Sequence, residues 1–570
     1  MAKSNYPLYE TTIFEDFRIM TENVARKYPD RIAISYKKNP RDKDTVNVTY
    51  QKARDYIRNM GTELISMGCR DKHVALIGES SYQWICSYFS LMSIGAVVVP
   101  IDINLPLEEI AGTLNFAECE FMLFSSAMEA KIEGLRERVP CLRTFICMGE
   151  TTNDNVFKLS DIEAKGGERY KNGDNSYYDY KINPDRLATI VFTSGTTGKG
   201  KGVMLSQKNI VSDMTQGMYN FAISPKTMNV LPPHHTFGST VNFVGHFSQG
   251  SEIYISSGLK YISNEMKEQQ PSHLVLVPLF VESMYKKIWS GAEKNGQAKN
   301  LRRLMKVSNV LRKFGIDLRR KLFKSSILDS FGGKLEMIIC GGASLNQDII
   351  DTFDAIGITI LNGYGITECA PLISCNRNKY RKKGSVGTPI IGELVKIKDP
   401  DANGEGEICV KGPNVMLGYY KDPKATAEVF DEEGYFKTGD YGKLDEEGWI
   451  YITGRLKNLI ILSNGKNVYP EEIETEISRI FGVSEVVVYA GESKAQNSKE
   501  VIVAEIFPDY DALKTRGIKD EQHYFENEIK KVNNRMVSYK AVKLVKIRNE
   551  EFKKNTSKKI LRRTIDKNID

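Results

Sequence analysis

The chain has 570 residues, 41% of them hydrophobic and 26% charged, with a formal net charge of +7. These values exclude a disordered or fibrous protein, and the length predicts several structural units. The longest apolar stretch, Tyr88 to Ile101, is shorter than the roughly 18 residues that span a bilayer, and residues 1–10 lack the apolar segment of a secretory signal. Nine scattered cysteines without a CxxC pair indicate reduced thiols, so we expect a cytoplasmic protein.

Apolar runs along the chain alternate between helical and strand-like spacing. Helices are predicted over 14–28, 82–92 and 106–116, and strands over 31–36, 74–77 and 96–100. Polar, glycine-rich residues 166–176 are expected to form a loop. Further strands are predicted at 187–192, 273–277, 335–340 and 358–361. Strands that alternate with helices predict an α/β fold with largely parallel sheets.

After about residue 390 the pattern changes to short strands. They are separated by three turn sequences, Asp401-Ala-Asn-Gly404, Asp431-Glu-Glu-Gly434 and Asp445-Glu-Glu-Gly448, which indicate a β-rich subdomain. From Arg455 onward, helical and strand-like runs return. We therefore predict a large N-terminal domain, residues 1–456, made of stacked α/β subdomains and a β-rich subdomain, and a small mobile C-terminal α+β domain, residues 457–570.

The predicted strand 187–192 opens into a loop, Thr193-Ser-Gly-Thr-Thr-Gly-Lys-Gly-Lys-Gly202, that is rich in glycine, hydroxyls and positive charge. Backbone N–H groups, hydroxyls and ammonium groups of such a loop can wrap phosphates. Gly195 to Lys201 also fits the Walker pattern G-x-x-x-x-G-K, which requires a following Ser or Thr and then a helix. Gly202 follows instead, and Val203 to Ser206 is predicted to be a strand, so the pattern argues against a Walker site.

The loop resembles the signature Ser/Thr-Ser-Gly-Ser/Thr-Thr-Gly-x-Pro-Lys-Gly of the superfamily of acyl-CoA synthetases, luciferases and peptide-synthetase adenylation domains, with Gly200 in place of proline. Other segments resemble the same superfamily in the expected order, and these are 231–238, 341–345, 363–368, 435–440, 453–458, 463–472 and 553–563. The resemblance runs from about residue 20 to residue 563. It implies an ATP-dependent, AMP-forming ligase that activates a carboxylic acid as an acyl-adenylate and transfers the acyl group to a thiol.

The resemblance also implies a role for each matching residue. The implied ATP-binding residues are Thr193, Ser194, Gly195, Thr196, Thr197, Gly198, Lys201, Gly342, Ala343, Tyr364, Thr367, Asp440 and Arg455. The implied acid-binding residues are His235, Gly341 and Gly365, the implied Mg²⁺ ligand is Glu368, and the implied catalytic residues are Lys559, Thr367 and Lys201. Lys457 matches the hinge between the two domains, and Gly465 matches the tunnel for the thiol.

Two positions depart from the superfamily pattern. Asn458 stands where Asp or Glu is common, and Lys558 replaces the glycine before the catalytic lysine. The register at Lys559 comes from counting back from Ile560-Leu-Arg-Arg563. A neighbouring lysine is therefore an alternative for the catalytic role.

Only the resemblance indicates which acid is the substrate and which thiol accepts the acyl group. Leu274 to Trp289, with the long insert that follows, resembles the long-chain fatty acyl-CoA synthetase branch. The expected reactants are a fatty acid, ATP and CoA, with Mg²⁺ as cofactor and no nucleic acid. The alternatives are a freestanding ligase for acyl carrier protein, a ligase for an aryl or other non-fatty acid, and a non-catalytic nucleotide-binding homologue. The last is disfavoured by the joint presence of Lys201, Glu368, Asp440, Arg455 and Lys559.

The insert carries the basic character of the chain. Residues 294–324 hold eleven Lys or Arg and one acidic residue, Asp317, a surplus of +10, so the rest of the chain carries 7 − 10 = −3. From Lys299 to Phe314 the spacing predicts an amphipathic helix whose basic side holds Arg302, Lys306, Asn309 and Lys313, with apolar residues over the remainder. One interpretation is a helix packed on the large domain. The other is that Lys299–Lys324 contacts an anionic membrane, as a peripheral protein of its inner face, or an acyl carrier protein.

Overall fold

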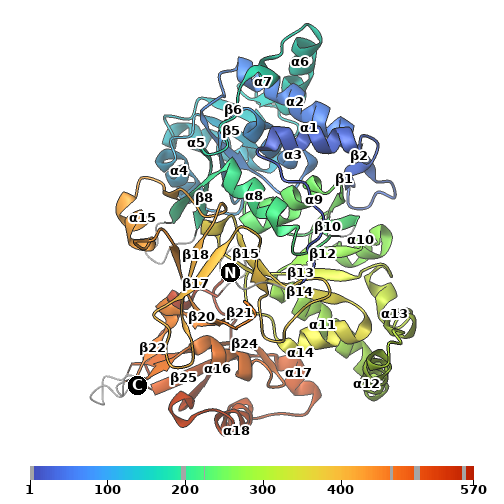
Figure 1. Ribbon diagram of the computed structural model, residues 1–570, viewed down its shortest axis with the longest axis vertical. Coiled ribbons are helices and arrows are strands. Elements are labelled where there is room, and N and C mark those ends of the chain that lie inside the picture. The colour runs from blue at the N-terminus through green and yellow to red at the C-terminus, as the bar shows by residue number, and fades with distance from the viewer. Residues whose placement is uncertain are drawn as a thin grey trace. The chain divides into compact units, whose positions relative to one another are not determined.

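The structure, a computed structural model, describes residues 6–193, 200–223, 225–462, 466–492, 501–554 and 560–569. The chain forms two compact units (Figure 1). Unit 1 comprises Met1–Leu394 and Val410–Phe436, and unit 2 comprises Val395–Cys409 and Lys437–Asp570. Unit 2 thus takes in strands that precede residue 457, while the predicted domain boundary at residue 457 and the mobility of the C-terminal domain stay predictions.

The first sheet of unit 1 has eight strands in the order β19-β9-β8-β4-β3-β5-β6-β7. Neighbours from β8 to β7 run parallel, and β9 and β19 are antiparallel to their neighbours. The strands are β3 (His73–Ile77), β4 (Val97–Ile101), β5 (Phe121–Phe124), β6 (Thr144–Cys147), β7 (Phe157–Lys158), β8 (Leu187–Thr193), β9 (Lys201–Ser206) and β19 (Gly418–Tyr419). Residues 75, 77 and 122–124 of this sheet are almost fully buried, which explains their apolar runs.

The second sheet has nine strands in the order β16-β15-β14-β13-β12-β10-β11-β1-β2. The pairs from β14 to β1 are parallel, and the outer pairs are antiparallel. The strands are β1 (Ile32–Tyr36), β2 (Val46–Thr49), β10 (Lys226–Asn229), β11 (Glu252–Ile255), β12 (His273–Leu276), β13 (Met337–Cys340), β14 (Thr359–Gly365), β15 (Leu372–Cys375) and β16 (Thr388–Pro389). These parallel sheets confirm the predicted fold class.

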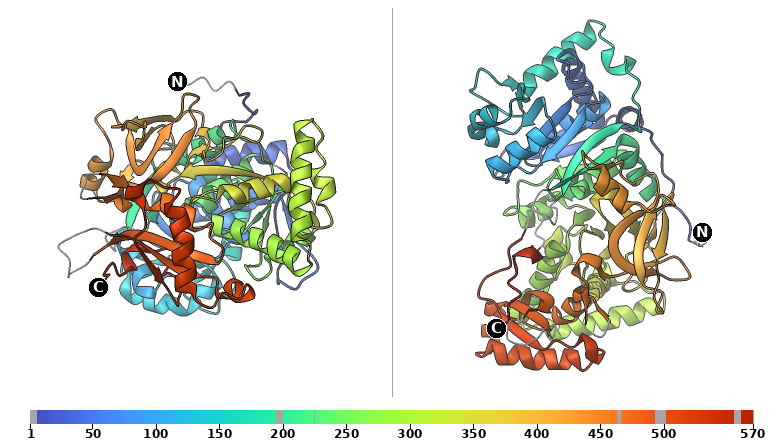
Figure 2. Two further views of the ribbon diagram at one scale, coloured as in Figure 1. Left: turned by 90° about the horizontal axis from the view of Figure 1, so that it is seen from below. Right: turned by 90° about the vertical axis from the view of Figure 1, so that its left-hand side faces the viewer.

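Helices pack around both sheets (Figures 1 and 2). Those of unit 1 are α1 (Phe17–Lys27), α2 (Tyr50–Ser66), α3 (Tyr82–Ser93), α4 (Leu107–Phe116), α5 (Ile132–Arg138), α6 (Leu159–Lys171), α7 (Ser176–Asp179), α8 (Gln207–Gly217), α9 (Gly245–Ser248), α10 (Ile262–Gln269), α11 (Pro278–Lys294), α12 (Ala298–Lys313), α13 (Arg319–Leu322), α14 (Gln347–Ile356) and α15 (Pro423–Val429). Side-chain oxygens cap α1 and α3, where Asp16 accepts from the N–H of Ile19 and Ser81 from that of Trp84. No described helix is long and apolar enough to cross a membrane.

The predicted loop at 166–176 is wrong in its first half. Helix α6 continues through Gly166 and Gly167 to Lys171, and it packs against α2. A Cβ atom at Gly166 would lie 1.8 Å from the main-chain oxygen of Asn59. The two glycines therefore allow a close contact between two helices, although the same residue type in a polar segment usually marks a turn.

Unit 2 contains most of a β-rich sheet and a small α+β layer. The four-stranded sheet has the order β17-β18-β20-β21, and its strands are β17 (Leu394–Lys398), β18 (Gly406–Lys411), β20 (Phe436–Leu444) and β21 (Ile450–Arg455). A three-stranded sheet follows, with β24 (Val483–Gly491), β25 (Val501–Pro508) and β26 (Leu544–Ile547), and its core includes residues of α16 (Pro470–Ile477), α17 (Tyr510–Thr515) and α18 (Glu521–Asn533). The short pair β22 (Ile460–Ile461) and β23 (Asn467–Val468) completes the unit.

The predicted glycine turns of the β-rich segment are present. Gly404, Gly434 and Gly448 have φ values of 75°, 78° and 83°, in the left-handed region that favours glycine. In each turn the aspartate three residues earlier accepts main-chain N–H groups through its carboxylate.

Two buried carboxylates lie in unit 1 near the segment that leads into the β-rich sheet. Asp213 of α8 is 0% exposed and Glu393 is 7% exposed. One oxygen of Asp213 accepts from the N–H of Leu372, at 2.9 Å. Burial raises the pKa of the Glu393 carboxyl from 4.5 to about 8, and it also raises the pKa of Asp213.

We expect Glu393→Gln to flatten the dependence of thermal stability on pH. The folded protein keeps the Glu393 proton up to about pH 8, whereas the unfolded chain releases it above about 4.5. The free energy of unfolding of the wild type therefore falls as the pH rises through this window. Calorimetry across the window should show a decline of several degrees in the wild-type Tm that is smaller in the variant, which keeps the contribution of Asp213.

Glu432→Gln, at an exposed carboxylate of the same unit, is the control and should keep the wild-type slope. Equal slopes for wild type and Glu393→Gln would show that Glu393 is ionised in the folded protein.

Candidate active site

The glycine-rich loop joins two antiparallel strands. Thr193 of β8 pairs with Lys201 of β9, and the Thr193 hydroxyl donates to the main-chain oxygen of Lys201 at 3.4 Å. The predicted strand after the loop is confirmed, and the absence of a helix directly after Gly202 in this described stretch excludes a Walker arrangement. The predicted residues Ser194, Gly195, Thr196, Thr197 and Gly198 lie outside the described residues.

Lys201 belongs to a chain of three side chains at the base of this loop. Its Nζ lies 4.4 Å from the centroid of the Tyr419 ring. The Tyr419 hydroxyl donates to Oε1 of Glu368 at 3.0 Å. Burial raises the pKa of Tyr419, and the Glu368 carboxylate raises it further, so the phenol is a neutral donor. One neutral residue thus contacts a cation through its ring and a carboxylate through its hydroxyl.

Backbone pairing positions these three residues. Tyr419 of β19 lies opposite Val203 of β9, and the N–H of Leu417 donates to the oxygen of Met204. The main-chain oxygen of Glu368 accepts from the N–H of Met416 at 2.8 Å. The segment that carries Tyr419 is therefore bonded both to the strand of Lys201 and to the backbone of Glu368.

Sequence reasoning missed Tyr419. In the sequence it is one of two adjacent tyrosines after a glycine, and no local pattern separates it from Tyr420. The Tyr420 hydroxyl reaches Glu118 instead, at 3.3 Å. Only the pairing of β19 with β9 tells which ring lies over Lys201.

Several other predicted residues gather at the carboxyl ends of the nine-stranded sheet. His235 follows β10, Gly341 to Ala343 follow β13, and Thr367 follows β14, and these strands belong to one parallel set. Ligands of open α/β sheets bind outside such strand ends. A Cβ atom at Gly341 would lie 3.2 Å from the Phe237 ring, so the histidine segment and the small-residue segment are neighbours.

Tyr364 and Gly365 end strand β14. Tyr364 is 6% exposed and pairs with Ser374 across to β15. A Cβ atom at Gly365 would lie 2.0 Å from the main-chain oxygen of Pro371. Gly365 thus has a packing requirement of its own, in addition to its implied role at the acid site. Gly342 has a φ of 92°, and Ala343 beside it is exposed.

A second histidine accompanies His235. The two rings of His234 and His235 lie 4.3 Å apart between centroids. Nε2 of His234 lies 3.6 Å from Oδ2 of Asp102, which directly follows β4. Burial lowers the pKa of His234, and Asp102 acts in the opposite direction. The sequence suggested neither residue: within segment 231–238 the motif assigns a role only to His235, and Asp102 lies in no matching segment.

In unit 2, Asp440 and Arg455 lie directly opposite each other on β20 and β21. Nε of Arg455 is 2.9 Å from Oδ1 of Asp440, which is 3% exposed. Lys457 follows in a short 3-10 helix (Leu456–Asn458), and partial burial together with Arg455 lowers its pKa. The departure at Asn458 is accommodated, since its side-chain amide donates to Glu471. Gly465 and Lys559 lie outside the described residues.

Glu368 fits the role of a magnesium ligand. Among the described residues no Lys or Arg forms an ion pair with it, so its charge is available to a cation. No group of three or more His, Cys, Asp or Glu side chains in the described part of the chain is placed to hold a metal by itself. Mg²⁺ commonly binds through one or two carboxylates and the phosphates of a substrate, which this arrangement allows.

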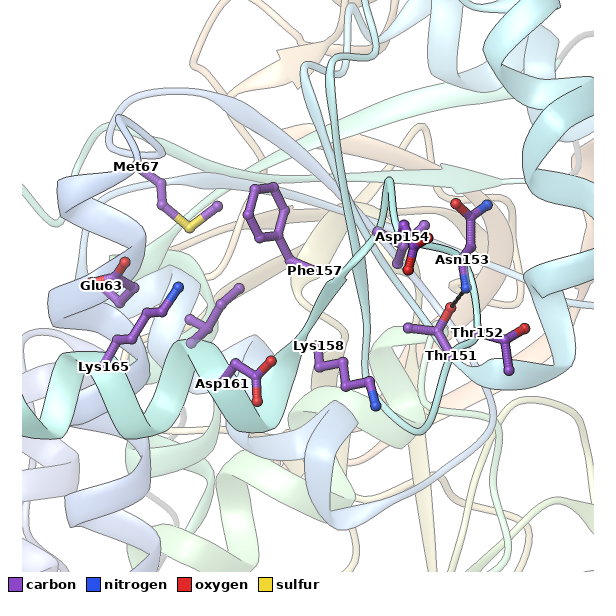
Figure 3. A pocket seen from close by; sticks show the side chains of 12 residues that line it. Glu63, Met67, Thr151, Thr152, Asn153, Asp154, Phe157, Lys158, Asp161 and Lys165 are labelled. Carbon is purple, nitrogen blue, oxygen red and sulfur yellow. Dashed lines mark hydrogen bonds between the residues drawn. The ribbon is translucent and has the colours of Figure 1, made fainter.

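A cavity of about 400 Å³ lies elsewhere in unit 1 (Figure 3). Residues from α2, from the loop before β7 and from α6 line it, including Glu63, Thr151 and Lys165. None of its lining residues belongs to the predicted site. The Lys201, Tyr419 and Glu368 cluster and this cavity are therefore separate features of unit 1.

Comparison with known proteins agrees with this fold. The AMP-binding enzyme family matches residues 21–420, so the chain belongs to that family, and it is an AMP-forming ligase. The chain is 30% identical over 508 residues to the long-chain-fatty-acid–CoA ligase 5 of Rattus norvegicus, covering 83% of this chain and 72% of the relative. It is 28% identical over 540 residues to a chloroplastic long-chain-fatty-acid–[acyl-carrier-protein] ligase, AEE15, of Arabidopsis thaliana, covering 81% and 73%.

Solved structures show the same fold. The anthranilate CoA ligase AuaEII in complex with anthranoyl-AMP superposes with a TM-score of 0.75 at 17% identity, covering 98% of this chain and 97% of that one. At this identity the likeness concerns the fold alone.

We expect Tyr419→Phe to lower acid-dependent ATP–pyrophosphate exchange by about tenfold. The variant keeps the ring under Lys201 but loses the hydrogen bond to Glu368, and a tenfold loss corresponds to about 1.4 kcal/mol. Exchange rates at saturating ATP give the measurement. Tyr420→Phe is the matched control, because its hydroxyl contacts Glu118 outside the cluster. Equal losses in the two variants would contradict the role of Tyr419.

Proposed function

We propose that the protein adenylates a long-chain fatty acid, releases pyrophosphate, and then transfers the acyl group to the thiol of CoA. The observation that carries this proposal is the Lys201, Tyr419 and Glu368 cluster at the base of the glycine-rich loop. It offers a cation for a phosphate and a carboxylate for a metal at neighbouring positions. The names of the relatives support a fatty acid as substrate.

Adenylation needs no catalytic triad, because the substrate carboxylate is itself the nucleophile that attacks the α-phosphorus. The protein has to position the two reactants and stabilise the negative charge that develops on the phosphate. We assign charge stabilisation to Lys201, Thr367 and Lys559. Mg²⁺, when bound at Glu368, supplies further positive charge to the phosphates. Asp440 is assigned to the ribose hydroxyls, and Arg455 holds Asp440 in place through their ion pair.

We propose that the second step, transfer of the acyl group to the thiol, takes place in a different arrangement of the two domains from the adenylation step. We assign Lys457 as the hinge and Gly465 as part of the thiol tunnel, on the resemblance described above. In this scheme rotation about Lys457 withdraws Lys559 from the phosphate site and lets the thiol reach the acyl-adenylate. Partial burial and the nearby guanidinium of Arg455 lower the pKa of Lys457, and the carboxylate of Asp440 acts in the opposite direction.

The acceptor and the acid each have one competing assignment. The chloroplastic relative is named as a ligase for acyl carrier protein, which favours that acceptor as the second candidate. An aryl acid is the second candidate substrate, and the anthranilate CoA ligase AuaEII has the same fold. We propose a cytoplasmic enzyme that works beside a membrane, where a long-chain acid accumulates.

Acid-dependent ATP–pyrophosphate exchange across short, long and aromatic acids tests the substrate class. We expect long-chain acids to give the highest kcat/KM, because only a long apolar chain removes a large apolar surface from water on binding. A thioester assay that compares CoA with holo acyl carrier protein then assigns the acceptor. The proposed substrate would be overturned if an aromatic acid is preferred, or if none of the tested acids supports exchange.

Lys559→Ala should abolish adenylation and spare thioester formation from preformed acyl-AMP. The expected loss in pyrophosphate exchange is at least about 10²-fold, the usual effect of removing one charge-stabilising donor. Lys558→Ala is the matched control at the adjacent lysine. If Lys558→Ala loses exchange and Lys559→Ala does not, the catalytic lysine is one position earlier than proposed.

A further inference from the structure

Helix α12 lies at the edge of unit 1, beside α11 and α14 (Figure 1). The predicted helix at 299–314 is thereby confirmed as Ala298–Lys313. Three of its residues, Leu301, Met305 and Ser308, are buried. Successive residues of an α-helix are about 100° apart, so these three form one line that faces the core of the unit.

The apolar residues on the other side of α12 are not packed. The exposed fractions of Val307, Val310 and Phe314 are 48%, 52% and 77%, and that of Ile316 is 47%. At about 100° per residue, Val310 and Phe314 point almost directly away from the buried line. The helix thus packs on unit 1 through its buried line, as the first interpretation expects, and leaves apolar as well as basic residues exposed. Single exposed apolar side chains are common, but an exposed aromatic ring next to several exposed aliphatic side chains forms a contiguous apolar patch, and such patches often mark a binding surface.

Cations surround this apolar ridge. The residues that share the outward side or follow it are Lys299, Arg303, Lys306, Lys313, Lys321 and Lys324, and none of them forms an ion pair within the described part of the chain. Four other basic residues of the insert have partners, and one of them, Arg320, donates to the main-chain oxygens of Leu335 and Gly333. Arg302 lies over the Trp289 ring at 5.1 Å, and Arg312 and Arg319 both bind Asp354. The predicted basic side thus divides into structural cations and unpaired ones.

We propose that this surface docks the protein on the anionic face of a lipid bilayer. The surface, called here the α12 face, consists of Lys299, Arg303, Lys306, Val307, Val310, Lys313, Phe314 and Ile316. A ridge of apolar side chains flanked by Lys and Arg matches the boundary of a bilayer, where apolar groups enter the acyl region and cations meet anionic headgroups. An acidic protein would use the cations but would leave the exposed Phe314 ring without a comparable apolar environment.

Docking deepens the proposed function, because it would place a fatty acid ligase where its acid partitions. The binding itself depends only on the α12 face. Failure of one proposal can therefore be told from failure of the other: membrane binding is read from vesicles without any substrate, and catalysis is read from pyrophosphate exchange with a soluble acid.

The test is co-sedimentation of the full chain with phosphatidylcholine vesicles and with vesicles that also contain phosphatidylglycerol. The wild type should bind the anionic vesicles at least about tenfold more strongly, and the difference should shrink as salt is added. Arg303→Gln, Lys306→Gln and Lys313→Gln, combined, should lower binding to anionic vesicles about tenfold and remove most of the salt dependence. Val310→Ser with Phe314→Ser should weaken binding at every salt concentration.

The control variant combines Lys514→Gln, Lys519→Gln and Lys530→Gln, which removes the same charge from exposed lysines of unit 2. It should bind as the wild type does. Pyrophosphate exchange on a soluble acid should be unchanged in all three variants, which also shows that they are folded. The proposal is overturned if the wild type does not bind anionic vesicles, if the control loses binding equally, or if the α12 variants lose only the capture of holo acyl carrier protein.

Discussion

Pairing of β19 with β9 is the interaction on which the site of unit 1 depends. It brings a tyrosine from position 419 under a lysine from position 201, and the hydroxyl of the same tyrosine reaches Glu368. Three distant segments thereby meet: Lys201 and Tyr419 are more than two hundred residues apart in the sequence, and Tyr419 and Glu368 are about fifty apart. The glycine-rich loop between β8 and β9 begins at Thr193 and ends at Lys201, and these two residues are paired across the strands.

The neutral tyrosine has a chemical consequence for the two charged residues. A lysine in direct contact with a glutamate would neutralise it, and neither charge would then be fully available to a ligand. Lys201 and Glu368 each contact Tyr419 instead, so in the proposed function the charge of Lys201 is available to a phosphate and that of Glu368 to a metal. Asp440 and Arg455 show the opposite design in unit 2, since there a direct ion pair orients a buried carboxylate.

The α12 face and the cluster of Lys201, Tyr419 and Glu368 both lie in unit 1, but different structural features produce them. The cluster is built from backbone pairing and from the buried Tyr419, whose pKa is raised. The α12 face is built from side chains that the core leaves unused, because the helix buries only the line of Leu301, Met305 and Ser308. Exposed side chains of this kind can be substituted without disturbing the core. Such a surface can therefore determine the location of an enzyme without affecting its reaction.

Local patterns were sufficient for most elements and for the reaction class. Apolar periodicity predicted β3, α3, β4 and the strand after the glycine loop, because each of these signals lies within one short segment. Lys201, Glu368, Asp440 and Arg455 could likewise be chosen from the sequence, since they match the motifs of a known superfamily in order along the chain. Their roles toward ATP, the acid and the metal remain proposals.

Contacts between distant segments decided the rest. The glycines of α6 were interpreted as a loop, because only Asn59 of α2, more than a hundred residues away, shows that they serve close helix packing. Tyr419 could not be told from Tyr420 without the register of β19, and the outward side of α12 could not be found without its buried side. Residue chemistry and local periodicity are written in the sequence itself. Which side chains meet depends on strand register and helix rotation, and these are set by packing across the whole unit.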